Sequence, residues 1–223
     1  MSYSRFAIYY VAPDGPLADF GATWLGWDIA RGCETPQLQM AGLSDITMTP
    51  HKYGFHGTLK PPFRLSQSLS QAKLKAALDR LADGLAPAMC DGLALTTLGH
   101  FLALTPRGNL ADLEAVAVAC VRELDAFRAP ASVAELARRR QAGLSARQEA
   151  LLTTWGYPYV MEEFRFHLTL SSKLPKDDIS AWVDAAQRHL PELPTPFVVD
   201  HIALCGERDD GRFELIHSYA LSG

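Results

Sequence analysis

Apolar and polar residues alternate with a period of two in two segments of the chain, residues 53–60 and 164–171. Such alternation is typical of strands that bury one face. The remaining apolar pattern predicts further strands over 5–12, 93–98, 101–105, 197–205 and 212–221. Helical spacing predicts helices over 17–29, 68–85, 110–127 and 177–190, and a more polar helical region over 132–156. Residues 31–52 are expected to be irregular.

The order of these elements repeats roughly in the two halves of the chain. In each half an alternating strand is followed by proline, an amphipathic helix and two further strands. The short turns between those strands, such as Gly99-His100 and Asp209-Asp210-Gly211, favour hairpins. The sequence therefore predicts an α+β fold with antiparallel pairing, and not a doubly wound parallel sheet.

Each alternating strand carries the same short motif, His56-Gly57-Thr58-Leu59 in the first and His167-Leu168-Thr169-Leu170 in the second. Residues two apart on a strand face the same side. We therefore expect two polar faces, one with His56, Thr58 and Lys60, and the other with Arg165, His167, Thr169 and Ser171. The opposite face of each strand is apolar and belongs to the core.

Two histidines beside two threonines suit the chemistry of a phosphate ester. One neutral imidazole can take a proton from water while a protonated one gives a proton to the leaving oxygen. Threonine hydroxyls can donate hydrogen bonds to the charged phosphate oxygens. The scheme needs neither a metal nor a cofactor. A single His-x-Thr strand is weak evidence, because hydrogen-bonded structural histidines are common, and it is the duplication that points to function.

Further side chains are candidates for substrate binding, and each has a structural alternative. Lys60 and Arg165 offer positive charge, although Pro61 follows Lys60 directly and Arg165 can instead pair with a neighbouring glutamate. Tyrosines near turns can wall a ribose or a base, or simply anchor packing; they are Tyr53, Tyr157, Tyr159 and one of the adjacent pair Tyr9 and Tyr10. Arg138-Arg139-Arg140 can bind an anion, but a solvated helix face is the simpler interpretation.

The composition of the chain limits the kinds of molecule that it is expected to bind. The 223-residue chain has a formal net charge of −4, whereas proteins that grip long nucleic acid usually carry a basic excess. We expect a small phosphorylated substrate. The four cysteines are not spaced for zinc or disulfides, and no apolar run approaches a membrane span, which favours the cytoplasm. No His-Glu-x-x-His or His-x-His sequence occurs, although histidines from distant strands can still converge on a metal.

The paired motifs resemble those of the 2H phosphoesterase superfamily, which is named for two His-x-Thr/Ser motifs. The longer blocks Lys52 to Phe63, and Trp155 to Tyr159 upstream of Phe164 to Leu170, resemble a bacterial branch associated with phosphonate-utilisation operons. The resemblance spans nearly the whole chain, from Arg5 to Leu221.

The resemblance implies one bilobal domain over residues 1–223, with two similar lobes of antiparallel sheet, helices packed outside and a central cleft. It implies His56 and His167 as the acid–base pair, with Thr58 and Thr169 as phosphate-binding hydroxyls. Residues 130–160 would be an added helical segment that can cover the cleft. One implied substrate is a cyclic ribose phosphate from phosphonate metabolism. Two alternatives stay open, a nucleotide or phospho-sugar binding protein without turnover, and an RNA 2′,3′-cyclic phosphodiesterase.

Overall fold

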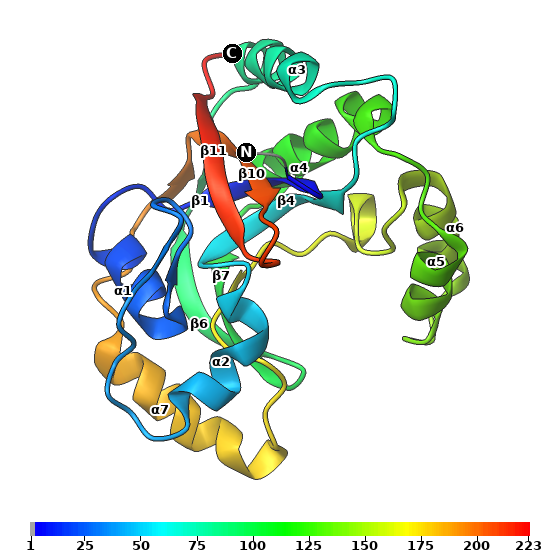
Figure 1. Ribbon diagram of the computed structural model, residues 1–223. Coiled ribbons are helices and arrows are strands. Elements are labelled where there is room, and N and C mark those ends of the chain that lie inside the picture. Colours follow the sequence, from blue (N-terminus) through cyan, green and yellow to red (C-terminus); the bar gives the residue numbers. More distant parts are fainter. Residues whose placement is uncertain (1–2) are drawn as a thin grey trace.

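The computed structural model describes residues 3–223, and an antiparallel sheet of seven strands forms its centre (Figure 1). Its strand order is β11-β10-β1-β4-β8-β7-β6. These strands are β1 (Phe6–Val11), β4 (His56–Phe63), β6 (Gly92–Leu98), β7 (Phe101–Arg107), β8 (Leu168–Thr169), β10 (His201–Glu207) and β11 (Phe213–Ala220). Two short ribbons pair β2 (Trp27–Asp28) with β3 (Cys33–Glu34), and β5 (Ala88–Cys90) with β9 (Phe197–Val199).

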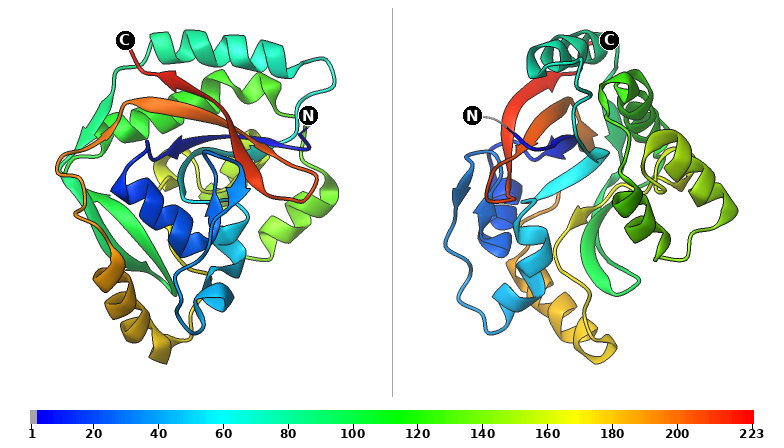
Figure 2. Two further views of the ribbon diagram at one scale, coloured as in Figure 1. Left: turned by 60° about the vertical axis from the view of Figure 1, so that its left-hand side comes forward. Right: turned by 45° about the vertical axis from the view of Figure 1, so that its right-hand side comes forward.

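Helices surround the sheet in groups. The α-helices of the described chain are α1 (Pro16–Leu25), α2 (Leu43–His51), α3 (Gln71–Asp83), α4 (Ala111–Glu123), α5 (Val133–Arg140), α6 (Ala146–Trp155) and α7 (Ile179–His189). Short 3-10 turns occur at Asp125–Phe127, Met161–Glu163 and Lys176–Asp178. Helices α3 and α4 lie near one end of the molecule, α1, α2 and α7 near the other, and α5 and α6 stand together at the side (Figures 1 and 2).

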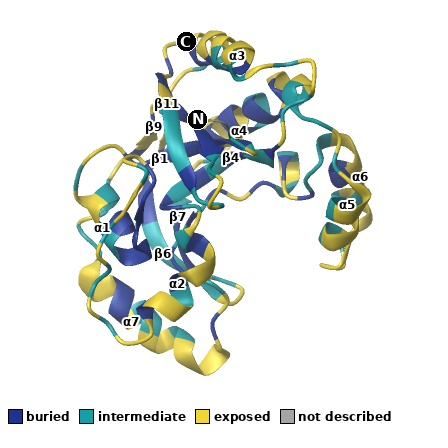
Figure 3. Cartoon of the chain, in the orientation of Figure 1, coloured by how far each residue is buried: buried dark blue, intermediate teal, exposed yellow. Residues whose placement is uncertain are grey.

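The two faces of β1 belong to different apolar clusters. Phe6, Ile8 and Tyr10 pack in the main core, to which α1, α3, α4 and α7 contribute. The alternate residues Tyr9 and Val11 pack on the other face, in a smaller cluster with the β2 segment and β11. Helices α5 and α6 contribute no residue to the main core, and most of their surface is exposed (Figure 3). The face of β1 that carries Tyr9 is the one that bears the candidate site.

The two halves of the sequence pattern exchange their hairpins in space. The hairpin β6-β7, which follows β4 in the chain, pairs with β8, and the hairpin β10-β11, which follows β8, joins β4 through β1. Strand β4 therefore lies in the same half of the sheet as the hairpin β10-β11. Strand β8 lies in the same half as the hairpin β6-β7. The two halves meet where β4 pairs with β8, and the predicted α+β fold with antiparallel pairing is confirmed.

Several element boundaries differ from the sequence prediction; for example, the helix expected over 17–29 ends at Leu25. Helix α2 lies in a segment expected to be irregular. Its N-cap residue Gly42 offers no side-chain cap and Pro50 lies inside it, so the usual sequence signals of a helix are missing. The expected strand over 164–171 shrinks to Leu168–Thr169. Strand β4 runs on to Phe63 through two prolines, which lie where its register with β1 is irregular and fewer backbone donors are needed.

Candidate active site

The two His-x-Thr motifs lie side by side in the middle of the sheet. Gly57 of β4 is opposite Leu168 of β8 in an antiparallel pair. This register puts four half-buried side chains on one face, each histidine opposite the threonine of the other motif: His56 with Thr169, and His167 with Thr58. Directly opposite Cβ atoms lie about 4.5–5.5 Å apart, and diagonal ones about 7–8 Å, which is the relation of the two histidines.

Both imidazoles are held by the same hydrogen bond. Nδ1 of His56 lies 2.9 Å from the carbonyl oxygen of Gly54, and Nδ1 of His167 lies 2.7 Å from that of Arg165. A carbonyl oxygen can only accept, so each Nδ1 carries the proton and donates. In a neutral ring, Nε2 is then left with its lone pair free for proton transfer. The hydroxyl of Thr58 lies 3.1 Å from Nε2 of His56 and donates to it in that state.

Gly54 is needed for the first of these hydrogen bonds. Its φ of 70° is left-handed, and an added Cβ would lie 2.6 Å from Cβ of Ile29. Only glycine adopts this conformation without strain in so little space. The turn at Gly54 thus sets the carbonyl that orients His56.

The ring of Tyr9 forms the floor under the first histidine. It stacks on His56 with ring centroids 3.8 Å apart, and it is 1 % exposed. Burial lowers the pKa of His56 to about 4, against the opposing effect of the Gly54 carbonyl, and the nearby His167 lowers it further. Burial also lowers the pKa of His167. With no anion bound, both imidazoles are therefore neutral at pH 7.

Aromatic side chains continue from Tyr9 toward the helical segment. The ring of Tyr53 lies 6.1 Å from that of His56 and 5.4 Å from that of Phe213. Tyr53 thus lies on the histidine side of the sheet. Tyr157 packs against the small apolar cluster that contains Leu151 of α6, and burial raises its pKa. Of the adjacent pair on β1, it is Tyr9 that faces the site, whereas Tyr10 packs in the main core.

Lys60 lies on the opposite face of the sheet from the histidines, so the expectation that it shares their face is wrong. Thr58 pairs with Tyr9 but Lys60 pairs with Ile8, because a β-bulge places an extra residue in β4 between them. Lys60 is 2 % exposed, and its Nζ donates to the carbonyl of Val121 at 3.0 Å and lies 3.9 Å from Asp125. Burial lowers its pKa to about 8.

This placement predicts that Lys60→Met leaves catalysis intact. Methionine fills similar volume without a charge to bury, so the free energy of unfolding should change by less than about 1.5 kcal/mol. Denaturant unfolding and steady-state hydrolysis measure the two effects. Asp125 keeps its ion pair with Arg128 in the variant, which limits the loss to the lysine itself. A large loss of kcat without a loss of stability would instead put Lys60 in the site.

The side chains of the other two expected substrate-binding residues, Arg165 and Tyr159, contact other groups. The guanidinium of Arg165 donates to the carbonyl of Glu162 at 3.0 Å and to that of Phe164, and it borders a cavity of ≈ 230 Å³ together with Phe166. Phe164 and Phe166 belong to the main core, so this cavity is on the other side of the sheet. Tyr159 is 43 % exposed and touches the ring of Tyr157 edge-on.

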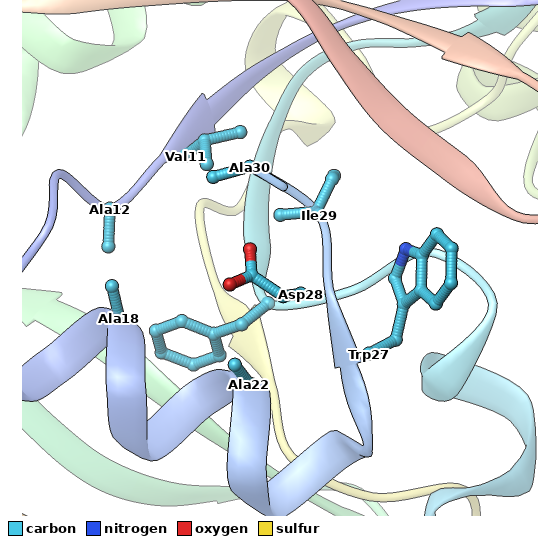
Figure 4. A pocket seen from close by; sticks show the side chains of 9 residues that line it. Val11, Ala12, Ala18, Ala22, Trp27, Asp28, Ile29 and Ala30 are labelled. Carbon is cyan, nitrogen blue, oxygen red and sulfur yellow. The ribbon is translucent and has the colours of Figure 1, made fainter. Parts of the chain in front are cut away.

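A small separate cavity lies between α1 and the segment Trp27 to Ala30 (Figure 4). Its lining is apolar apart from Asp28, whose carboxylate is bound by Arg31 at 2.6 Å. It contains no motif side chain. Within residues 3–223, no group of three or more histidine, cysteine or acidic side chains is placed to hold a metal ion. None of the helices among those residues is both long and apolar enough to cross a membrane.

The fold and the site define an α+β protein with paired His-x-Thr motifs on adjacent antiparallel strands. The chain matches the family described as "Protein of unknown function (DUF1045)" over residues 58–214, and it belongs to that family. This match contains Thr58 and the whole second motif, and it begins two residues after His56.

Two curated relatives are similar over most of this chain. Both bear the name ribose 1,5-bisphosphate phosphokinase PhnN. The one from Janthinobacterium sp. (strain Marseille) is 36% identical over an alignment of 221 residues, and the match covers 94% of this chain and 49% of the relative. The one from Laribacter hongkongensis (strain HLHK9) is 37% identical over an alignment of 190 residues, and the match covers 83% of this chain and 44% of the relative. The chain thus spans about half the length of these relatives.

Solved structures with a distant likeness include two that are aligned over nearly their full length. TT0787 of Thermus thermophilus has a TM-score of 0.46 at 14% identity, covering 98% of both chains. E. coli LigT complexed with 3′-AMP has a TM-score of 0.42 at 14% identity, covering 100% of both chains.

Proposed function

We propose that this chain is a metal-independent phosphoesterase of the 2H type, which hydrolyses a small cyclic phosphodiester with His56 and His167 as the acid–base pair. The observation that carries the proposal is the register of β4 and β8, which sets each histidine opposite the threonine of the other motif. The matching Nδ1 hydrogen bonds support it, because they leave the lone pair of each neutral ring on Nε2. The Thr58 hydroxyl, which donates to Nε2 of His56 in this structure, would turn to the phosphate when substrate binds.

In this mechanism the phosphate of the substrate lies between the two imidazoles. Nε2 of one histidine takes a proton from a water as the water oxygen attacks phosphorus. The P–O bond to the ring oxygen breaks, and Nε2–H of the other histidine protonates that oxygen. The hydroxyls of Thr58 and Thr169 donate to the non-bridging oxygens and hold their negative charge in place. Solvent then exchanges the proton between the histidines and resets the pair.

One histidine must be protonated before the reaction, although burial lowers both pKa values. A bound phosphodiester supplies the missing charge, because an anion close to an imidazole favours the imidazolium form. The site is thus set to acquire its proton together with its substrate. Which histidine becomes the acid depends on where the leaving oxygen lies.

A phosphorylated ribose is the substrate that the relatives suggest. The printed name of both concerns ribose 1,5-bisphosphate, and hydrolysis of a cyclic phosphodiester on a ribose phosphate yields a ribose bisphosphate. The 223 residues contain no Gly-Lys-Ser or Gly-Lys-Thr triplet, the end of the phosphate-binding loop of many kinases. We propose that this chain supplies hydrolysis and that the phosphokinase activity in the name belongs to the part of the relatives outside the match.

The substrate is proposed to be small. A formal net charge of −4 disfavours long polyanions. The helical segment 130–160 stands at the side of the sheet (Figure 1). We propose that this segment bounds the site on that side and limits the room for RNA.

The test is a hydrolysis assay on a matched panel: ribose 1,2-cyclic phosphate, nucleoside 2′,3′-cyclic phosphates and an oligoribonucleotide with a 2′,3′-cyclic end. We expect turnover of the small cyclic substrates that persists in EDTA. Tight binding with no turnover would contradict an enzyme and favour a phospho-sugar sensor. Loss of activity with chelator would contradict a metal-independent mechanism, and preference for the oligonucleotide would indicate RNA processing.

A further inference from the structure

Three consecutive arginines end helix α5, and the structure gives them different environments. Arg138 is exposed, and Arg140 is paired with Glu149 at 2.6 Å. Arg139 turns inward, and its guanidinium lies 4.6 Å from the ring centroid of Tyr157. Its Nε is buried and has no hydrogen-bond partner among residues 3–223. The arginine run is therefore not simply a solvated helix face.

The carboxylate of Glu135, on the preceding turn of α5, already has other hydrogen-bond partners. Glu135, one helical turn before Arg139, accepts from Arg64 at 2.9 Å and from the backbone nitrogen of Ser132, where it completes the capping box of α5. No acidic side chain among residues 3–223 forms an ion pair with Arg139 within 4.0 Å. A half-buried guanidinium without a counter-charge is costly, and its planar donors suit a phosphate.

Positive charge is in excess around this arginine. Arg139 lines a cavity between α5 and the end of β4, whose charged lining residues are Arg5, Arg64, Arg128, Arg139 and Glu135. Three of these arginines have acidic partners, namely Glu207 for Arg5, Glu135 for Arg64 and Asp125 for Arg128. The remaining guanidinium, that of Arg139, is the one free to take an anion.

Arg139 is connected to the histidine pair through aromatic side chains. Its guanidinium stacks on Tyr157 and lines the same cavity as Arg5, whose own guanidinium lies 5.8 Å from the ring centroid of Phe213. The Phe213 ring lies 5.4 Å from that of Tyr53, which in turn lies 6.1 Å from that of His56. A ligand that reaches from the histidines to Arg139 would thus pass over aromatic faces, which suit a sugar ring.

We propose that Arg139 and Tyr157 form a second anion subsite, which binds a phosphate monoester carried by the same substrate whose diester lies between the histidines. The position of the diester between the histidines rests on the proposed function, whereas binding of the monoester by Arg139 does not. The planar guanidinium donates two hydrogen bonds to the monoester oxygens, and Tyr157 keeps its orientation. The helical segment that bounds the site thereby also selects substrates with two phosphates.

The kinetic test compares cytidine 2′,3′-cyclic phosphate with and without a 5′-phosphate. Arg139→Gln should raise KM for the 5′-phosphorylated substrate by about 10- to 100-fold, the loss expected for a charge-assisted hydrogen bond. The unphosphorylated substrate should change less than about 3-fold, and Arg139→Lys should be intermediate, because lysine keeps the charge without the fork. The neighbouring exposed Arg138→Gln is the matched control and should change neither substrate.

A binding test separates this subsite from catalysis. Calorimetry with ribose 5-phosphate, in a background of His56→Gln and His167→Gln, should show binding that weakens about 10-fold or more on Arg139→Gln and does not change on Arg138→Gln. If neither cyclic substrate is turned over but this binding depends on Arg139, the proposed function fails and the subsite stands. Equal effects of Arg139→Gln on both cyclic substrates, or ribose 5-phosphate binding indifferent to Arg139, would overturn the subsite.

Discussion

Replacing either motif histidine by glutamine is expected to reduce kcat for a small cyclic phosphodiester by about 10²- to 10⁴-fold, the range for loss of a general acid or base. Glutamine can still hydrogen-bond but does not transfer protons near neutral pH. Because the two histidines act in one proton relay, the double variant should lose little more than the more damaging single one. Steady-state hydrolysis with excess substrate measures each effect.

His51→Gln provides the matched control. Its Nδ1 also binds a backbone carbonyl, that of Leu25 at 2.7 Å, but it lies on α2 and outside the paired motifs. Its loss should cost stability and leave kcat within about 3-fold, since surface and structural hydrogen bonds contribute roughly 1 kcal/mol. Full activity in His56→Gln or in His167→Gln, with the thermal transition preserved, would show that the pair is structural.

Local patterns carried much of the information about the site. The alternation around His56 and His167 was enough to place each histidine and its threonine on one face, opposite apolar residues, but it was wrong for Lys60. The hairpins β6-β7 and β10-β11 followed from short turns between apolar runs. These features depend on neighbours within a few residues, which is the range over which periodicity and turn chemistry act.

Features set by contacts distant in the chain could not be predicted. The register that places Gly57 against Leu168 joins residues 111 positions apart, and neither strand specifies its partner alone. The β-bulge that turns Lys60 away depends on the match between β4 and β1. The inward turn of Arg139 depends on its contact with Tyr157, and nothing local distinguishes it from Arg138.

Gly57→Ala is the substitution expected to damage the site most without touching a catalytic group. A Cβ at Gly57 would lie 2.2 Å from Cζ of Phe166, a buried ring immediately before His167. The ring packs directly on the backbone of β4 and so holds the second motif against the first. Displacing it should cost about 1–3 kcal/mol in the free energy of unfolding, the range for overpacking. A shift of His167 by about 1 Å should lower kcat roughly 10²-fold.

A double-mutant cycle with Phe166→Leu isolates this contact, because leucine lacks the ring atoms that the new methyl group would meet. If the overlap is the cause, the double variant should recover part of both the stability and kcat lost in Gly57→Ala, giving a coupling of about 0.5–3 kcal/mol. Gly84→Ala serves as the control, since a Cβ there meets its nearest atoms at 3.8 Å. Strict additivity of the two substitutions would mean that Gly57 is required for a reason other than the approach of Phe166. The close contact between β4 and the second motif would then not be what sets the distance between the two imidazoles.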